Sequence, residues 1–309
     1  MEKKLVSIIV PAYNVDEYLE ECVQSLLCQT YTNYEIVIID DGSTDNTYTI
    51  GKCLASHSAK IKLFHQKNQG VSIARNIGMQ KAKGEYYIFV DADDVVMPQY
   101  VNILVSCVEK ADMGIIGFTS KREELATEVN KDITFNSEFN IIEEILCGTN
   151  YDGYLWNKIF QKAIIEKYDL KFKSKITVWE DLLFVLEYLK HCNQIAILDE
   201  KLYYYRYREG SAVNNLRIDK YRSKYEVMEE IKRKKIASTN QSKKRTSFLY
   251  FETLFSYLNQ SLISKNASNE LNEILAKVDM LELLKLGNIK LFFKFLYLQM
   301  KMKYKGLFT

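Results

Sequence analysis

The stretch Gly-Glu-Tyr-Tyr-Ile-Phe-Val-Asp-Ala-Asp-Asp, residues 84–94, decides the fold of this chain. Its apolar run, Tyr86 to Val90, is short, continuous and rich in aromatic and β-branched residues, which is typical of a strand buried on both faces. Three carboxylates follow the run, on Asp91, Asp93 and Asp94. Because carboxylates at close range repel one another, we expect either an exposed turn or a positively charged ligand among them.

Three similar runs precede this strand, at Val6–Val10, Glu35–Ile39 and Ile61–Phe64. Helical patterns follow the first run, over residues 17–27, and the third, over residues 71–82. Short buried strands that alternate with helices predict a doubly wound α/β sheet with mostly parallel strands. Ligands of such sheets bind at the carboxyl ends of the strands. Here those ends read Pro-Ala-Tyr-Asn, Asp-Asp-Gly-Ser and Asp-Ala-Asp-Asp, and we expect them to share one edge.

The pattern changes after Phe118. Helical patterns appear at residues 141–146, 157–167 and 182–190, and a strand pattern at 195–198. From about residue 216 the pattern is helical to the last residue. The sequence therefore predicts three regions, residues 1–120, 121–215 and 216–309.

Composition excludes several classes of protein. A net charge of +2 over 309 residues gives no indication of a nucleic-acid partner. The six cysteines include no C-x-x-C pair, so we expect reduced thiols in a cytoplasmic protein. The first apolar run is too short for a signal peptide, and no uncharged apolar stretch approaches the roughly 18 residues of a membrane-spanning helix.

Each polar strand end has a structural interpretation beside a functional one. The segment 40–45 is either a strand-to-helix turn capped by Ser43 or Thr44, or a carboxylate site for a nucleobase or ribose. The segment 91–93 is either an exposed turn, or a D-x-D pair that binds Mg²⁺ or Mn²⁺ together with substrate phosphates. Glu180 and Asp181 are also ordinary residues for the first turn of a helix.

Seven segments, taken together and in order, make the chain resemble glycosyltransferase family 2, the inverting GT-A transferases that use nucleotide-diphosphate sugars. They are VSIIVPAYN, IDDGSTDNT, KNQGVSIARNIG, GEYYIFVDADD, WNKIF, WED and YYYRYREGS. The resemblance covers about the first 215 residues and implies a GT-A fold with a helical C-terminal extension. Residues 1–120 would bind the nucleotide sugar, and residues 121–215 would hold the acceptor and the catalytic base.

The resemblance also implies donor-site residues. The nucleotide sugar would contact Pro11, Ala12, Tyr13, Asp40, Asp41, Gly42, Ser43, Arg75, Asp91, Ala92, Arg206 and Ser211. Asp41 would bind the uracil of a UDP-sugar. Asp93, with Asp91, would bind Mn²⁺ or Mg²⁺. Whether Arg206 or Arg208 approaches the diphosphate stays open.

The implied catalytic base is Asp181, which would take the proton from an acceptor hydroxyl as the oxygen attacks the anomeric carbon. Displacement in one step from the opposite face inverts the anomeric configuration. Glu180 would orient the acceptor. Trp179 and Lys158 are candidates for acceptor binding, with a place in the core as the alternative.

The implied function is transfer of a hexose or N-acetylhexosamine from a UDP-sugar to a glycan or lipid-linked saccharide, during synthesis of a capsule or another cell-surface polysaccharide. The alternative is a non-catalytic GT-A-fold subunit that stabilises another glycosyltransferase. The retained D-x-D and Glu-Asp pairs argue against that alternative. Whether the chain forms homo- or hetero-oligomers stays open.

The last helical pattern, residues 289–302, places Lys290, Lys294 and Lys301 on one face. Two interpretations stay open. The helix packs on protein with its lysines in water, or it lies on the anionic inner face of the plasma membrane.

Overall fold

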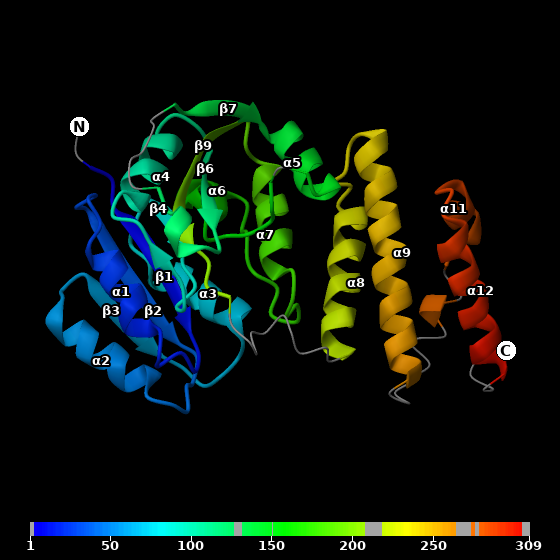
Figure 1. Cartoon of the computed structure of the whole chain (residues 1–309), viewed down its shortest axis with the longest axis horizontal. Coiled ribbons are helices and arrows are strands. Elements are labelled where there is room, and N and C mark those ends of the chain that lie inside the picture. Colours follow the sequence, from blue (N-terminus) through cyan, green and yellow to red (C-terminus); the bar gives the residue numbers. More distant parts are fainter. Residues whose placement is uncertain are drawn as a thin grey trace. The chain divides into compact units, whose positions relative to one another are not determined.

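The structure is a computed structural model that describes residues 3–126, 132–149, 151–207, 218–263, 273–275 and 278–304. The chain divides into two compact units (Figure 1). The sheet unit comprises Met1–Ile142 and Tyr151–Ser211, and the helical unit comprises Glu143–Asn150 and Ala212–Thr309. All the strands in the described part of the chain belong to the sheet unit.

The first half of the sheet unit alternates strands and helices. Its elements are β1 (Val6–Ala12), α1 (Leu19–Leu27), β2 (Tyr34–Asp40), α2 (Thr47–His57), β3 (Ile61–His65), α3 (Val71–Lys81), β4 (Tyr86–Phe89), β5 (Val95–Val96) and α4 (Tyr100–Val108). The second half contains β6 (Met113–Thr119), η1 (Arg122–Glu124), β7 (Thr134–Ser137), β8 (Lys158–Gln161), α6 (Lys162–Lys167), α7 (Glu180–Leu189) and β9 (Gln194–Tyr204). The helix α5 (Glu138–Cys147) begins in the sheet unit, and its residues from Glu143 onward belong to the helical unit.

One mixed sheet joins all these strands, in the order β3-β2-β1-β4-β8-β6-β9-β5, with β7 also paired to β9. The strands β3, β2, β1 and β4 are parallel neighbours. Side chains alternate between the two faces of this half. Ile8 packs in the same cluster as Leu19 of α1, whereas the neighbouring Ile9 contacts α3 at Gly78. Burial on both faces explains why β1, β2 and β4 read as continuous apolar runs, and the arrangement confirms the doubly wound α/β prediction.

Residues 157–167, predicted to be one helix, form strand β8 and the short helix α6 instead. β8 lies between β4 and β6 and pairs antiparallel with both. Its Ile159 and Phe160 are completely buried. Pairing with two neighbours distant in sequence therefore outweighs the local helical pattern. β9 likewise extends beyond the predicted residues 195–198, because the tyrosine-rich segment continues the strand.

The helical unit contains α8 (Ile218–Arg233), α9 (Asn240–Ile263), α11 (Met280–Lys285) and α12 (Ile289–Tyr304), so the predicted helical C-terminal region is confirmed. α8 and α9 lie side by side (Figure 1). Leu291, Phe295 and Leu298 of α12 are buried in one cluster with Leu254 and Leu258 of α9. Their spacing of four and three residues places them on one face of α12, as expected for an amphipathic helix.

Candidate active site

The carboxyl ends of β1, β2 and β4 meet at one edge of the sheet. β1 pairs in parallel with β2 on one side and with β4 on the other. Ala12 lies opposite Asp40, and the backbone amide of Asp41 donates to the carbonyl of Ala12 at 2.8 Å. Residues 90 and 91 follow β4 at the same edge. The polar strand ends therefore share one rim.

Asp41 organises the loop that follows β3. Its side chain is 3% exposed. Oδ1 accepts from the Gln66 side chain at 2.6 Å and from the Gln69 amide at 2.9 Å, and Oδ2 accepts from the Gly70 amide at 2.7 Å. A carboxylate has about four acceptor positions, so these three donors leave one for a ligand.

Asp40 supports the rim beside Asp41. It is 1% exposed, and its Oδ2 lies 2.6 Å from Nδ1 of His65. The His65 ring packs on Tyr48, with the ring centroids 4.7 Å apart. Asp40 thus fixes the end of β2 to the end of β3, and its contact with a nucleotide stays a prediction.

The segment after β1 presents an aromatic ring to solvent. Tyr13 is 47% exposed, whereas Ala12 before it is buried. Asn14 has a left-handed φ of 49°, which its side chain offsets by local bonding. Its amide donates to Oγ of Ser43 at 3.1 Å, and its Oδ1 accepts from the Thr44 amide at 2.8 Å. These bonds fasten the two strand ends together and leave the Tyr13 ring able to stack on a base.

The three carboxylates after β4 have different surroundings. Asp94 is 1% exposed, and its side chain accepts from the Tyr203 hydroxyl at 2.6 Å and from the Arg206 amide at 2.8 Å. Burial and the nearby charges of Asp91 and Asp93 raise the pKa of Asp94 to about 8. Asp91 is 32% exposed, and Asp93 is also partly exposed. Asp94 is therefore part of the protein framework, whereas Asp91 and Asp93 are both partly accessible to solvent.

Arg75 connects the D-x-D turn to the start of α7. It is 6% exposed, its Nη1 donates to Glu180 at 2.7 Å, and its Nη2 donates to Asp91 at 3.3 Å. The guanidinium carbon lies 5.5 Å from the centre of the Phe172 ring. Burial opposes the charge, but the carboxylates of Glu180, Asp91 and Asp181 raise the pKa of Arg75. A buried cation thus joins two acidic segments that are far apart in the sequence.

Glu180 and Asp181 form the first turn of α7. Trp179 before them has a φ of 67°, a conformation that is rare for a bulky residue and is concentrated at functional sites. Asp181 is half-buried, and its Oδ1 accepts from the Leu182 amide at 2.7 Å. Burial and the charge of Glu180 raise the pKa of Asp181 to about 7. A carboxylate with this pKa suits a general base at neutral pH.

Comparison with known proteins identifies the family to which this chain belongs. The family model described as "Glycosyl transferase family 2" matches residues 7–169, more than half of the chain. The chain belongs to glycosyl transferase family 2. The uncharacterized glycosyltransferase EpsJ of Bacillus subtilis is 34% identical over 214 residues, which cover 67% of this chain and 62% of EpsJ. EpsH of the same organism is 30% identical over 220 residues, which cover 69% of this chain and 64% of EpsH. The chain spans less than two thirds of the length of either relative.

Solved structures share the GT-A fold of this family-2 chain. TarS of S. aureus, residues 1–349 in complex with UDP-GlcNAc, superposes with a TM-score of 0.63 at 23% identity, covering 91% of this chain and 77% of TarS 1–349. The mannosyltransferase PcManGT of Pyrobaculum calidifontis, in complex with GDP-Man and Mn²⁺, superposes with a TM-score of 0.60 at 13% identity, covering 96% of this chain and 87% of PcManGT. At these identities the likeness concerns the fold alone.

The D-x-D pair fits a divalent cation that binds together with a diphosphate. Asp91 and Asp93 place carboxylates, which are hard oxygen donors, at the rim, and Asp94 is held by Tyr203 and Arg206. Within the described ranges no group of three or more His, Cys, Asp or Glu side chains is arranged to hold a metal ion. Mg²⁺ is commonly bound by one or two carboxylates, with water and substrate phosphates completing the octahedron. The residues therefore fit a cation that arrives with the nucleotide.

Arg206 lies beside the D-x-D turn. Its Nε donates to the Asp93 carbonyl at 2.8 Å, and its guanidinium also bonds to Glu21. The rings of Tyr18 and Tyr204 lie 5.2 and 5.7 Å from the guanidinium carbon. The other candidates for the diphosphate, Arg208 and Ser211, lie outside the described residues.

Lys158, a predicted acceptor residue, is completely buried. Its ammonium group donates to the carbonyls of Asp152 at 2.9 Å and Tyr154 at 2.7 Å, and to Oδ1 of Asn157 at 2.8 Å. All three ammonium hydrogens have acceptors, and burial lowers the pKa of Lys158 to about 7. Any effect of Lys158 on the acceptor therefore passes through the 152–154 loop that it holds.

The sequence does not single out His65, Gln66 and Tyr203, which support this site. The position of His65 and Gln66 in the sequence could have indicated their role, because β3 ends at His65 beside the end of β2. The polar end of β3 therefore belongs to the same rim. No local pattern predicts that Tyr203, in a run of tyrosines, is the one that bonds to Asp94.

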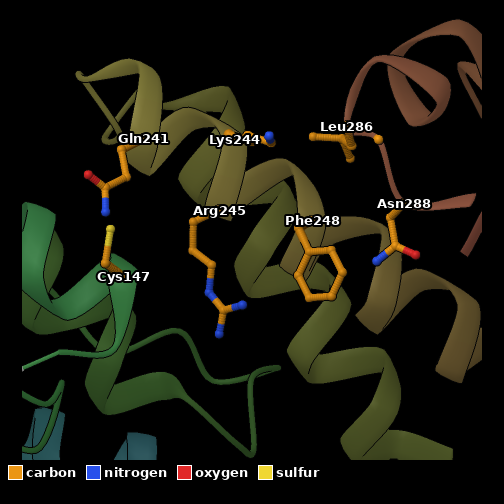
Figure 2. Close-up of a pocket in the computed structure, with 8 residues that line it drawn as sticks. Cys147, Gln241, Lys244, Arg245, Phe248, Leu286 and Asn288 are labelled. Carbon is orange, nitrogen blue, oxygen red and sulfur yellow. The ribbon is translucent and has the colours of Figure 1, made fainter.

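A cavity of about 680 Å³ in the helical unit is a separate feature (Figure 2). The described residues that line it are Cys147, Gln241, Lys244, Arg245, Phe248, Leu286, Gly287 and Asn288. None of them is a carboxylate that could act as a base or bind a cation. The acidic rim of the sheet unit is therefore the candidate active site. Of the helices described, none has the length and apolarity to cross a membrane.

Proposed function

We propose that the chain is a metal-dependent inverting glycosyltransferase that moves a hexose or N-acetylhexosamine from a UDP-sugar to a hydroxyl of a glycan or lipid-linked saccharide. The observation that carries the proposal is the Arg75 bridge, which brings Asp91 of the D-x-D turn and Glu180 beside Asp181 to one site. A scaffold subunit has no need of a buried cation between two such acidic segments.

In the proposed reaction, the acceptor oxygen forms a bond to the anomeric carbon while the bond from that carbon to the UDP oxygen breaks. The hydroxyl proton passes to Asp181. The pKa of Asp181, raised by burial and by Glu180, supports this role, because a base is most effective when its pKa lies near the working pH. Positioned bases of this kind contribute about 10²–10⁴-fold to the rate.

The donor side is assigned to the rim of β1, β2 and β4. Tyr13 would stack on the base, and Asp41 would use its remaining acceptor position for the uracil. Asp91 and Asp93 would hold Mn²⁺ or Mg²⁺, which supplies positive charge to the departing diphosphate when bound. TarS in complex with UDP-GlcNAc and PcManGT in complex with GDP-Man and Mn²⁺ share this fold, which supports a nucleotide sugar and a cation.

We further propose that the glycan extended by this reaction is a cell-surface polysaccharide. The chain would act on the cytoplasmic face of the plasma membrane. The exposed apolar side chains of α12, Phe293, Tyr297 and Met300, support contact with lipid, and exposed Lys290 and Lys294 support an anionic surface.

The first test is release of UDP from UDP-GlcNAc, UDP-glucose and UDP-galactose, by wild type and by the variants Asp93→Asn and Asp181→Asn. We expect wild type to hydrolyse one donor slowly and EDTA to stop it. Asp93→Asn should reduce release by about 10²-fold or more, because a charged ligand is lost from the cation. Asp181→Asn should abolish transfer to an added acceptor.

Asp169→Asn is the matched control, since Asp169 is exposed, lies outside the rim and has a left-handed φ of 48° that asparagine tolerates. Folded wild-type protein that neither binds nor cleaves any of these donors would contradict the proposal and favour a non-catalytic partner subunit.

A further inference from the structure

We propose that the ring of Tyr154 is a platform on which a pyranose ring of the acceptor packs, next to the catalytic base. The proposal rests on the transferase function above and adds the chemical class of the acceptor and the side chain that recognises it. It is argued from the position, the exposure and the support of this ring.

The loop that carries Tyr154 packs against the start of α7. A Cβ on Gly153 would lie 2.5 Å from Cδ1 and 2.8 Å from Cα of Leu182, so only glycine permits this approach. Leu182 directly follows Asp181, the proposed base. Burial and the carboxylates of Asp152 and Asp181 raise the pKa of the Tyr154 phenol, which agrees with a ring close to both acids.

One face of the Tyr154 ring is covered and the side chain remains 39% exposed. The ring stacks on Trp156 with the centroids 4.8 Å apart and the planes 13° apart, and it meets the ring of Phe118 edge-on at 5.7 Å. Trp156 in turn stacks on Tyr203 at 4.5 Å, and Tyr203 bonds to Asp94 of the D-x-D turn. Tyr154 is therefore the outermost ring of a stack that begins at the donor side of the site.

The buried Lys158 explains why this ring keeps its position. Its ammonium group binds the carbonyls of Asp152 and Tyr154, on both sides of Gly153. Burying an ammonium group is costly, and here two of its three hydrogen bonds fix one short loop while the third goes to the side chain of the adjacent Asn157. A platform held in advance loses less entropy when a ligand binds.

The chemistry of this surface suits a sugar ring. One face of a pyranose carries mainly C–H groups, which pack on the electron-rich face of an aromatic ring. Asp152, two residues before Tyr154, is exposed, and its carboxylate can accept hydrogen bonds from sugar hydroxyls. An acyclic polyol phosphate has no such face and its charge would be repelled by the neighbouring carboxylates. The geometry therefore favours a pyranoside as the acceptor.

The test uses the full chain, the UDP-sugar that wild type hydrolyses, and three acceptor probes, the n-octyl β-pyranosides of glucose, galactose and N-acetylglucosamine. UDP release is measured with and without each probe. We expect one pyranoside to accelerate release by wild type. Tyr154→Ala should raise the KM for that pyranoside about five- to tenfold. Acceptor-free release should stay unchanged when measured well below the Tm of the variant, which falls because the contacts with Trp156 and Phe118 are lost. Tyr154→Phe should retain the wild-type KM, since it keeps the ring.

Tyr168→Ala is the matched control, because Tyr168 is 41% exposed and its ring also stacks on one neighbour, His191, at 3.6 Å. An unchanged KM in Tyr154→Ala would overturn the platform, and so would an equal loss of acceptor-free release, which would indicate a structural role. A wild type that hydrolyses a UDP-sugar but that no pyranoside accelerates would overturn the acceptor class. Absence of any donor hydrolysis would instead mean that the proposed function itself fails.

Discussion

Asp181 allows a prediction of how the activity depends on pH. The pKa of its carboxyl group is raised to about 7, first by burial and then by the charge of Glu180. A base acts only when it is deprotonated, so kcat/KM for the acceptor should fall about tenfold for each pH unit below about 7 and level off above it. Initial rates of UDP release with acceptor, measured from about pH 5 to about pH 9, check this. A flat profile across that range would exclude Asp181 as the base.

The same raised pKa provides an independent check through stability. The unfolded Asp181 has its ordinary pKa of 3.8 and the folded one a pKa of about 7, so between these values the folded state keeps a proton that the unfolded state releases. The contribution of Asp181 to the free energy of unfolding therefore falls as pH rises. Above about pH 7 its ionised carboxylate destabilises the folded state by the full amount. Asp181→Asn should raise the free energy of unfolding at about pH 8, on the order of 1–3 kcal/mol, with a smaller gain at about pH 5. Urea unfolding at both pH values measures the difference.

At the residue scale, the sequence predicts where a residue lies when its location follows from a strand end. Asp41 and Asp91 follow buried strands, and parallel strand ends must meet at one edge. Lys158 and Tyr154 show the limit. Lys158 sits in a short strand that pairs with distant segments, and two of its three acceptors come from the preceding loop, with the third on the adjacent Asn157. Local composition contains no information about which loop will fold over it.

At the scale of elements, the turn after β2 and the loop after β3 act together. Gly42 has a φ of 71°, and a Cβ there would lie 2.6 Å from the backbone nitrogen of Asn68. Gly42→Ala should therefore displace the loop from Asp41, lower the free energy of unfolding by about 1–3 kcal/mol and weaken UDP binding. Urea unfolding and calorimetric titration with UDP measure the two effects.

Gly148→Ala is the matched control for that change. Gly148 also has a left-handed φ, of 67°, but no atom lies within 4 Å of a Cβ there. It shares the backbone strain of about 1 kcal/mol without the clash. Equal effects of the two substitutions on UDP binding would mean that the loop contact is irrelevant to the donor site.

Elements differ in how far the sequence predicts them. The strands β1, β2 and β4 are buried on both faces, so each reads as a continuous apolar run between clear turns, whereas the edge strand β3 is only partly buried. β8 contributes only Lys158–Gln161 before α6 begins, and its side chains also fit a helical spacing. Its strand state depends on β4 and β6, whose positions are fixed only when the whole sheet forms.

At the scale of the whole molecule, the two units differ in chemistry. The sheet unit contains the acidic rim, and the helical unit exposes apolar side chains near its last helix. Phe293, Tyr297 and Met300 are 57–64% exposed on α12, and Leu281 and Leu284 of α11 are 50–67% exposed. Lys290 is exposed beside them, Lys294 also packs near the Phe255 ring of α9 at 5.2 Å, and the Lys301 side chain lies outside the described residues.

These side chains predict binding to an anionic lipid surface. An interfacial helix gains free energy by burying apolar side chains and by attraction of its lysines to acidic headgroups. Replacing Phe293 and Tyr297 together by serine should weaken binding to phosphatidylglycerol vesicles about tenfold or more, because each ring contributes about 1.5–3 kcal/mol when buried. UDP release should not change.

Phe135→Ser, at a 48%-exposed position on β7, is the control. Co-sedimentation with vesicles measures the bound fraction. Binding equal to wild type in the double variant, or equal binding of wild type to neutral phosphatidylcholine vesicles, would favour a protein partner for this face over lipid.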